Sequence, residues 1–187
     1  MSRRILLVDD EPHILASLQR LMRNGLRDAG GERYQVEGFT DAMTALARAR
    51  ECAFALVVSD QRMPAMTGVE FLKELRQVQP DCGRIILSGY ADLSALMAAI
   101  NEAAIDRFIS KPWTDFELLS AVRQVLHIRE LMRENQRLAD QVRAQRGQLS
   151  AQEAELRRLE RLEPGITHVR WGSDGSFILE DPGEAVQ

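Results

Sequence analysis

Arg4-Ile5-Leu6-Leu7-Val8-Asp9-Asp10 is a short apolar run that ends in two adjacent acids. Three later segments share this design, an apolar run followed closely by one polar residue: Phe54–Val58 before Asp60, Arg84–Leu87 before Ser88, and Ile105–Ile109 before Lys111. Apolar runs without alternation are typical of strands covered on both faces, as in a parallel sheet. Tyr34–Phe39 alternates between polar and apolar residues, which favours a strand at the edge of the sheet.

Helical patterns separate the apolar runs, at Pro12 to about Arg27, Asp41–Arg50, Val69–Val78 and Leu93 to about Glu102. This alternation of strand and helix predicts an α/β domain with a parallel five-stranded sheet, doubly wound in the flavodoxin-like (βα)5 order. Ligands of such sheets lie outside the carboxyl ends of the strands, near the point where the strand order switches. The polar residues that follow the apolar runs are therefore expected to form one site.

The expected site combines three acids, Asp9, Asp10 and Asp60, with Ser88 and Lys111. Three carboxylates within a few ångströms repel one another, and the pKa of at least one rises unless a cation is present. Mg²⁺ suits such a set because it prefers hard oxygen ligands. With Mg²⁺ bound, one carboxylate can attack a phosphoryl group while the Lys111 ammonium and the Ser88 hydroxyl contact its oxygens. The sequence therefore predicts magnesium-dependent phosphoryl chemistry.

Five motifs resemble those of the receiver domain of two-component response regulators: Val8–Pro12, Ser59–Pro64, Thr67–Leu72, Leu87–Tyr90 and Ser110–Trp113. The resemblance covers about residues 3–126. It implies a flavodoxin-like receiver that takes a phosphoryl group from a cognate histidine kinase. Within these motifs, the local sequence is similar to receivers linked to HD-GYP phosphodiesterases or to hydrogenase-type regulators.

The resemblance implies a role for each residue of the acidic set. Asp60 would be the phosphoacceptor. Asp10 would bind Mg²⁺ directly, Asp9 would bind it largely through water, and Arg62 would contribute its backbone carbonyl. Ser88 and Lys111 would contact the phosphoryl group.

The resemblance also implies a switch formed by Ser88 and Phe108. A phosphoryl group that draws the Ser88 hydroxyl inward vacates space that the Phe108 ring can fill, which favours one of two packings. Because Phe lacks the hydroxyl group of Tyr, a signal through Phe108 would pass by packing alone. The peptide bond between Lys111 and Pro112 is a candidate for the cis form.

The segment after the receiver is expected to form a long helix. Thr114 to about Glu163 contains no Pro, and Gly147 is its only Gly. We therefore expect a receiver at 1–126, followed by a helix at 127–163 that continues the fifth receiver helix. A heptad repeat fits this helix, and its inner positions are Ile128, Leu131, Asn135, Leu138, Val142, Gln145, Leu149, Gln152, Leu156 and Leu159.

This heptad pattern predicts a parallel coiled-coil homodimer. Asn135 would fix the register at some cost in stability, and Gln145 and Gln152 would weaken the middle of the seam. The alternative is a solvated helix that packs on its own receiver. The sequence leaves open whether the dimer is permanent or forms on phosphorylation.

The last residues, 164–187, have a different composition. Ile166–Trp171 alternates, Asp174-Gly175 is a turn signal, and Phe177–Leu179 is apolar. This pattern predicts a short β-hairpin, and the alternative is a disordered tail.

Composition limits the function further. The chain has 187 residues and a formal net charge of −4, so nucleic-acid binding is not expected. No apolar run is long enough to span a membrane, and Cys52 and Cys82 are isolated, so a cytoplasmic protein with reduced thiols is expected.

No cluster of catalytic side chains follows residue 114, which favours a regulator over an enzyme. The predicted function is a phosphoacceptor that signals through dimerisation and contacts with an unidentified protein target. Two alternatives are a receiver that controls a cyclic-dinucleotide enzyme in trans, and a transcriptional regulator without a recognisable DNA-binding domain.

Overall fold

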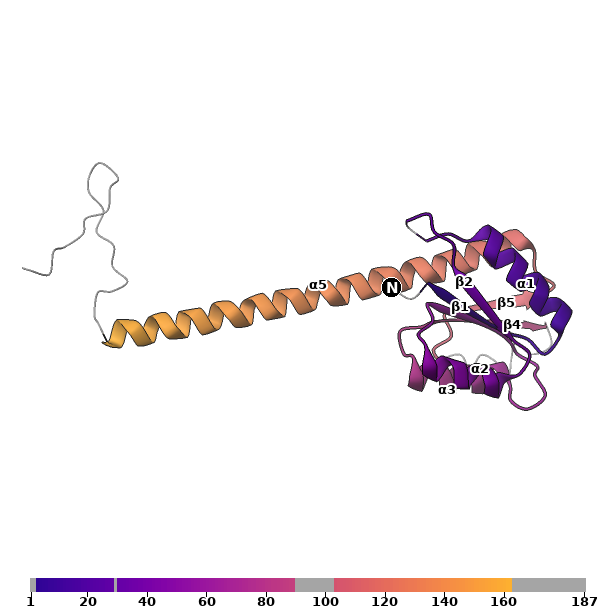
Figure 1. Ribbon diagram of the computed structural model, residues 1–187, viewed down its shortest axis with the longest axis horizontal. Helices are drawn as coiled ribbons and strands as arrows, with labels where there is room; N and C mark the ends of the chain where they lie inside the picture. The colour runs from indigo at the N-terminus through magenta and orange to yellow at the C-terminus, as the bar shows by residue number, and fades with distance from the viewer. Residues whose placement is uncertain (1–2, 29, 90–102, 163–187) are drawn as a thin grey trace, which may run out of the picture. The chain divides into compact units, whose positions relative to one another are not determined.

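The computed structural model describes residues 3–28, 30–89 and 103–162 (Figure 1). It divides into two compact units, Met1–Glu134 and Asn135–Gln187. The predicted fourth helix, which begins at Leu93, and the predicted hairpin within 164–187 lie outside the described residues.

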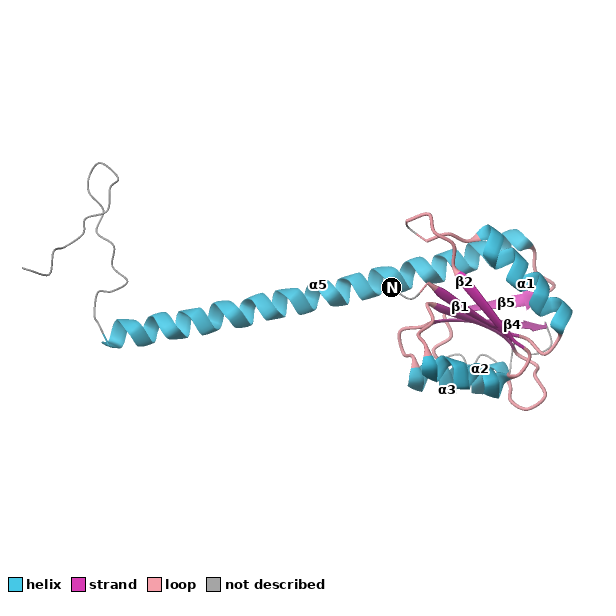
Figure 2. Cartoon of the chain, in the orientation of Figure 1, coloured by secondary structure: helices cyan, strands magenta, loops and turns pink. Residues whose placement is uncertain are grey.

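The first unit is built on a five-stranded parallel sheet (Figure 2). Its strands are β1 (Arg4–Val8), β2 (Gln35–Phe39), β3 (Leu56–Asp60), β4 (Gly83–Gly89) and β5 (Arg107–Lys111). The strand order is β2-β1-β3-β4-β5, and all neighbouring strands are parallel. This is the predicted flavodoxin-like order, and the alternating strand β2 lies at an edge of the sheet.

The described helices are α1 (Pro12–Gly25), α2 (Ala42–Glu51), α3 (Gly68–Val78) and α5 (Asp115–Leu162). Helix α2 begins after Asp41, whose carboxylate accepts the Thr44 N–H at 2.7 Å. Helix α3 has a capping box, in which the side chains of Thr67 and Glu70 each accept a backbone N–H of the other residue. These caps satisfy N–H groups that the first turn of a helix leaves without partners.

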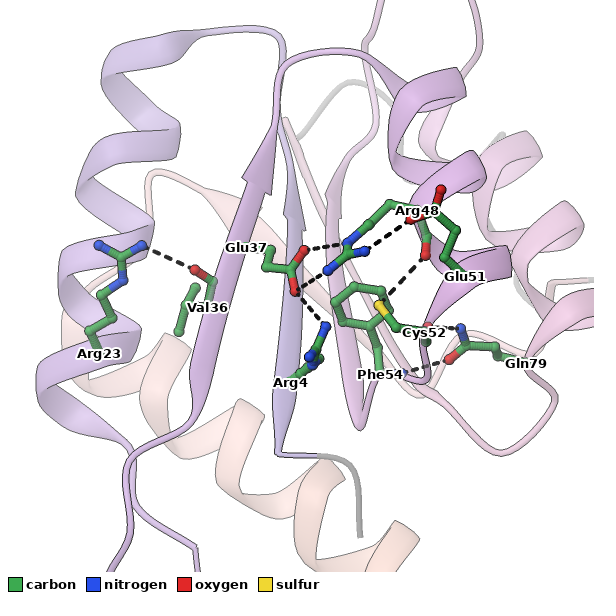
Figure 3. Close-up of polar contacts among 9 residues, drawn as sticks. All are labelled: Arg4, Arg23, Val36, Glu37, Arg48, Glu51, Cys52, Phe54 and Gln79. Carbon is green, nitrogen blue, oxygen red and sulfur yellow. Dashed lines mark hydrogen bonds and ion pairs between the residues drawn. The ribbon is translucent and has the colours of Figure 1, made fainter.

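Two strands begin two residues later than the sequence predicted. The Phe54 N–H donates to the side-chain oxygen of Gln79 at 2.8 Å, and β3 starts only at Leu56 (Figure 3). Before β5, Ala104 has a φ of 47°, a left-handed conformation, and the chain bends at Asp106, so β5 starts only at Arg107. Apolar composition alone does not reveal either local feature.

Two hydrophobic clusters cover the two faces of the sheet. Helices α1 and α5 cover one face and α2 and α3 the other (Figure 1). Since successive residues of a strand point to opposite faces, Ile5 and Leu7 of β1 join the α1–α5 cluster, whereas Leu6 and Val8 join the other.

Ion pairs reinforce the edge of the sheet near β2. The Glu37 carboxylate accepts from Arg48 Nε at 2.8 Å and from Arg4 Nη1 at 3.2 Å (Figure 3). The hydrogen bond from Arg48, opposed by burial, holds the pKa of Glu37 below its ordinary value. The network joins β1, β2 and α2 through side chains from three elements.

Arginine side chains fasten α5 to the first unit. Arg123 donates to the Gly25 carbonyl at 2.8 Å, Arg129 pairs with Asp106, and Arg133 donates to the Asp81 carbonyl at 3.1 Å. The compact unit consequently extends to Glu134, beyond the boundary at residue 126 that the sequence suggested.

The second unit contains α5 from Asn135 onward. Its apolar side chains Leu138, Val142, Leu156 and Leu159 are exposed, with exposed fractions between 38% and 52%. In the part of the chain that the structure describes, no helix is both long and apolar enough to cross a bilayer.

Candidate functional site

The register of the sheet brings two acids together. Val8 of β1 pairs with Ser59 of β3, so the next residues in each chain segment, Asp9 and Asp60, lie side by side. Both acids continue the face of the sheet that α1 and α5 cover. They meet at the carboxyl ends of adjacent strands, where the strand order switches, as the sequence predicted.

Lys111 bridges these two acids. Its Nζ atom lies 2.5 Å from Asp60 Oδ1 and 3.3 Å from Asp9 Oδ2. Asp9 is fully buried, and Asp60 is 5% exposed. Lys111 is the last residue of β5, on the same face as Ile109, so the sheet directs the ammonium toward the acids. The structure therefore brings together Asp9, Asp60 and Lys111 from three different strand ends.

Burial shifts the pKa of the groups in this cluster. Burial, with a smaller contribution from the Asp60 charge, raises the pKa of Asp9, although the Glu11 N–H and Lys111 oppose the rise. The pKa of Lys111 is lowered by burial, but its hydrogen bond and charge interaction with Asp60 outweigh this effect, and the net shift is upward. Lys111 therefore stays charged at neutral pH.

Backbone groups hold the two carboxylates in place. Asp9 Oδ1 accepts the Glu11 N–H at 2.9 Å, and Asp60 Oδ2 accepts the Arg62 N–H at 2.8 Å. Asp60 thus has one oxygen on the Lys111 ammonium and the other on a backbone amide. These two hydrogen bonds fix the orientation of the carboxylate.

The loop after Asp60 is closed by contacts with the start of α3. The Gly68 N–H donates to the Gln61 carbonyl at 3.0 Å, and the Gln61 side-chain oxygen accepts the Val69 N–H at 3.3 Å. A Cβ atom at Gly68 would collide with the Asp60 carbonyl oxygen, so only glycine allows this close approach. The Thr67–Glu70 capping box fixes the same turn.

Ser88 and Phe108, the predicted switch pair, lie on the opposite face of the sheet. Ser88 is buried on β4 beside Ser110 of β5, and Phe108 is paired with Ile86. Paired residues of parallel strands point to the same side, so the Phe108 ring and the Ser88 hydroxyl share a face. Ser88 Oγ donates to the Gly89 carbonyl at 3.4 Å, and Phe108 packs against the α2–α3 cluster.

The expectation that all three acids would gather within a few ångströms is not met. Among the described residues, no three Asp, Glu, His or Cys side chains form a group that could hold a metal ion by themselves. Asp10 follows Asp9 directly, at a bend between β1 and α1. Asp9 is buried, whereas Asp10 is half-buried.

The donor chemistry nevertheless fits a hard divalent cation. Asp9 and Asp60 already face one common cation, the Lys111 ammonium, and offer carboxylate oxygens from a buried position. Asp10 is the next residue after Asp9. The Arg62 N–H donates to the Asp60 carboxylate, which keeps the Arg62 backbone near this acid. Carboxylates, a carbonyl and water are the ligands that Mg²⁺ prefers.

Two contacts of the site could not be predicted from the residues. The Lys111 ammonium lies 5.8 Å from the centre of the Trp113 ring, a cation–π geometry. The contacts of Gln61 with α3 depend on loop conformation, which no residue pattern reveals. The peptide bond between Lys111 and Pro112 is cis, as predicted.

The predicted dimerisation residues lie along α5. Asn135 and the apolar residues of the stripe whose side chains are described are exposed: Ile128, Leu131, Leu138, Val142, Leu156 and Leu159. The side chain of Leu149 lies outside the described residues. The structure therefore leaves this stripe uncovered within a single chain.

Comparison with known sequences agrees with this geometry. The model of the response regulator receiver domain matches residues 5–123. The hydrogenase transcriptional regulatory protein HoxA of Cupriavidus necator is 37% identical over 134 residues, which are 72% of this chain and 26% of that protein. The response regulator protein TmoT of Ectopseudomonas mendocina is 30% identical over 153 residues, 81% of this chain and 66% of that protein. The chain thus spans about a quarter of the length of HoxA.

Solved structures show the same relationship. The signal receiver domain of an HD domain-containing protein from Pseudomonas fluorescens Pf-5 superposes with a TM-score of 0.59 at 38% identity, over 68% of this chain and 96% of that one. The hydrogenase regulator and the HD domain-containing protein correspond to the two subtypes that the motifs indicated. The family model covers well over half of the chain, and the sheet has the expected strand order. The chain therefore belongs to the response-regulator receiver family of two-component systems.

Proposed function

We propose that this chain is a phosphoacceptor response regulator that receives a phosphoryl group from a histidine kinase on Asp60. The observation that carries the proposal is the cluster of Asp60, Asp9 and Lys111 at the switch in strand order. Phosphotransfer is general to the receiver family. In this cluster, Asp60 offers a carboxylate that can accept the phosphoryl group, and Lys111 offers a positive charge beside it.

In the proposed reaction, a carboxylate oxygen of Asp60 attacks the phosphorus of a phosphohistidine. A P–O bond forms on Asp60 as the P–N bond to the imidazole breaks, and the electron pair of that bond leaves with the imidazole. Lys111, 2.5 Å from Asp60 Oδ1, is placed to stabilise negative charge on the transferred group. The Arg62 amide keeps the second carboxylate oxygen in place.

Mg²⁺ would fit this function as the cofactor, and Asp10, Asp60, the Arg62 carbonyl and, through water, Asp9 would hold it. When bound, the ion neutralises charge on the phosphoryl oxygens and the carboxylates. Asp9 and Asp60 are buried, and burial strengthens the interaction of their carboxylates with any cation.

The proposed output is carried by α5. Apolar side chains exposed along the helix, from Ile128 to Leu159, form a stripe that a second copy can cover in a parallel coiled coil. Phosphorylation shifts the Ser88–Phe108 switch and strengthens this self-association, which then presents a surface to a protein target. We place the protein in the cytoplasm, where the free thiols of Cys52 and Cys82 are kept reduced.

The test of phosphate acceptance uses the full chain with acetyl phosphate and Mg²⁺, and measures covalent phosphate by intact mass. The wild-type chain should gain one phosphoryl group, and Asp60→Asn should gain none because an amide is a poor nucleophile. Asp81→Asn, at an exposed position, is the matched control and should react as the wild type does. Uptake by Asp60→Asn at the wild-type rate would refute the assignment.

A second candidate function is a role in transcriptional control. HoxA of Cupriavidus necator is described as a transcriptional regulatory protein, and this chain resembles about a quarter of it. A further alternative, control of a cyclic-dinucleotide enzyme in trans, draws on the likeness to the receiver of an HD domain-containing protein. Identification of the proteins that bind only the phosphorylated chain separates these alternatives.

A further inference from the structure

We propose that the ion pair between Asp106 and Arg129 is the coupling element that carries the phosphorylation signal from β5 into α5. The inference rests on the proposed function, because it assigns a route to the signal that Asp60 would receive. It concerns residues that lie at the opposite end of β5 from the phosphorylation site.

Asp106 is held from two sides. Arg129 Nη2 lies 2.7 Å from Asp106 Oδ1 and 2.8 Å from Oδ2, and Arg129 Nε lies 3.3 Å from Oδ2. The same Oδ2 atom accepts the backbone N–H of Arg84 at 2.8 Å, and the Asp106 N–H donates to the Arg84 carbonyl at 2.9 Å. The Asp106 carboxylate therefore connects β4 with α5, at the residue immediately before β5 in the chain.

The ion pair is well protected from solvent. The Arg129 side chain is 16% exposed and the Asp106 side chain 23% exposed. Two other ion pairs of α5, Arg143 with Asp140 at 71% and 57% and Arg158 with Glu155 at 71% and 56%, are much more exposed. Burial strengthens an ion pair whose hydrogen bonds are satisfied. A displacement of Asp106 must therefore either move Arg129 with it or break the ion pair.

The buried Arg84 makes the Asp106 end of β5 stiff. Its guanidinium, in a side chain that is almost fully buried, donates to the carbonyls of Ala104, Gln79 and Pro80. These bonds hold the backbone just before Asp106, including the left-handed Ala104. Burial, and next the charge of the nearby Arg129, lowers the pKa of Arg84.

Strand β5 links this anchor to the phosphorylation site. The strand begins at Arg107, carries Phe108, and ends at Lys111, whose ammonium contacts Asp60. Five consecutive pairs with β4 hold its backbone in one continuous strand. A shift of Lys111 or Phe108 on phosphorylation is therefore transmitted to Asp106 and across the ion pair to Arg129. Arg129 follows Ile128, the first residue of the exposed stripe on α5.

Another contact between β5 and α5 runs parallel to the ion pair, from Arg107 to Gln124. That contact is exposed and joins a charged group to a neutral one. Arg123 and Arg133 attach α5 to the Gly25 and Asp81 carbonyls, which are not in β5. Among the described residues, Asp106–Arg129 is thus the charge pair that joins α5 to the residue directly before the strand that carries Phe108.

The test is hydrogen exchange of the backbone amides of residues 126–140 in the full chain, with Mg²⁺ and with or without beryllofluoride. In the wild type, beryllofluoride should change the exchange rate of these amides at least tenfold. Arg129→Gln should reduce that change to less than twofold. Arg143→Gln is the control, because it removes an ion pair that lies in the same helix and has no contact with β5. This variant should retain the wild-type change in exchange rate.

A structural role alone would raise exchange in both states and leave their ratio intact. A wild-type ratio in Arg129→Gln would therefore overturn the proposal, and so would an unchanged exchange rate in the wild type when ¹⁹F NMR shows bound beryllofluoride. Arg129→Lys, which keeps a cation near Asp106, should restore at least half of the response. If the wild type neither binds beryllofluoride nor takes phosphate, the proposed function itself fails, which is a distinct result.

Discussion

Two charged side chains of the site, Asp9 and Asp60, are buried, which lowers the stability of the fold. Asp9 is fully buried beside a second carboxylate, and burial raises its pKa. Lys111 offsets part of the repulsion because it lies within 3.3 Å of Asp9 and 2.5 Å of Asp60. Charges of this kind are retained at functional sites although an uncharged residue would be more stable.

Replacing Asp9 with Asn should therefore stabilise the fold. We expect Asp9→Asn to raise the free energy of unfolding at pH 7 by about 1 kcal/mol, because it removes the buried negative charge and keeps the shape of the side chain. Chemical denaturation of the two proteins measures the difference. Asp81→Asn, at an exposed site, should change the free energy by less than about 0.5 kcal/mol.

The effect of Asp9→Asn should depend on pH with a definite sign. The folded pKa of Asp9 is raised, so its stability contribution is fully present below the unfolded pKa of 3.8 and is lost as the pH rises through the folded pKa. The advantage of the Asn variant should hence be small in acid and grow toward neutral pH. An advantage that shrinks with rising pH would contradict the assigned shift.

At the scale of elements, much of the sheet could be predicted because apolar runs and the polar residues behind them reveal buried strands and their ends. Asp60 and Lys111 were placed correctly at strand ends for this reason. The starts of β3 and β5 could not be predicted, because they depend on the Gln79 side chain and on the left-handed Ala104 and the bend at Asp106.

The turn between β3 and α3 offers a prediction at this scale. Gly68→Ala should lower the free energy of unfolding by about 1–3 kcal/mol, because the added methyl group meets the Asp60 carbonyl. The strain should also slow phosphate uptake, since it displaces the phosphoacceptor. Denaturation and intact-mass kinetics measure the two effects.

Gly147→Ala is the control for this turn. It adds the same methyl group within α5, where no atom lies within 4 Å of the new Cβ. Alanine favours a helix over glycine by about 1 kcal/mol, so this variant should lose no stability. Equal losses from the two substitutions would show that crowding at Asp60 is not the cause.

At the scale of the whole molecule, helix α5 takes part in both compact units. Its first part is packed on the sheet through Leu118, Val122 and Val125, and its later apolar residues are exposed. A surface helix with exposed leucines at heptad spacing is stabilised when a second helix covers them. The sequence could predict this stripe because it depends only on periodicity, but not the arginine contacts that fasten the helix as far as Arg133.

Asn135 should limit the strength of self-association. Asn135→Leu replaces a polar side chain in the stripe, and we expect the dimer to be stabilised by about 1–3 kcal/mol, which lowers the dissociation constant roughly 5- to 150-fold. Sedimentation equilibrium measures this constant. Gln136→Leu adds a similar apolar group one position away, outside the stripe, and should leave the dissociation constant within about threefold of the wild type. Equal tightening by both variants would mean that Asn135 is not in the seam.

In the proposed function, a phosphoryl group on Asp60 controls the association of α5. Light scattering on a sizing column with Mg²⁺, over a range of concentrations and with or without beryllofluoride, tests this control. We predict that beryllofluoride lowers the dimer dissociation constant of the wild type at least tenfold and leaves that of Asp60→Asn unchanged. The same dissociation constant for the wild type in both conditions, with beryllofluoride bound, would contradict the claim.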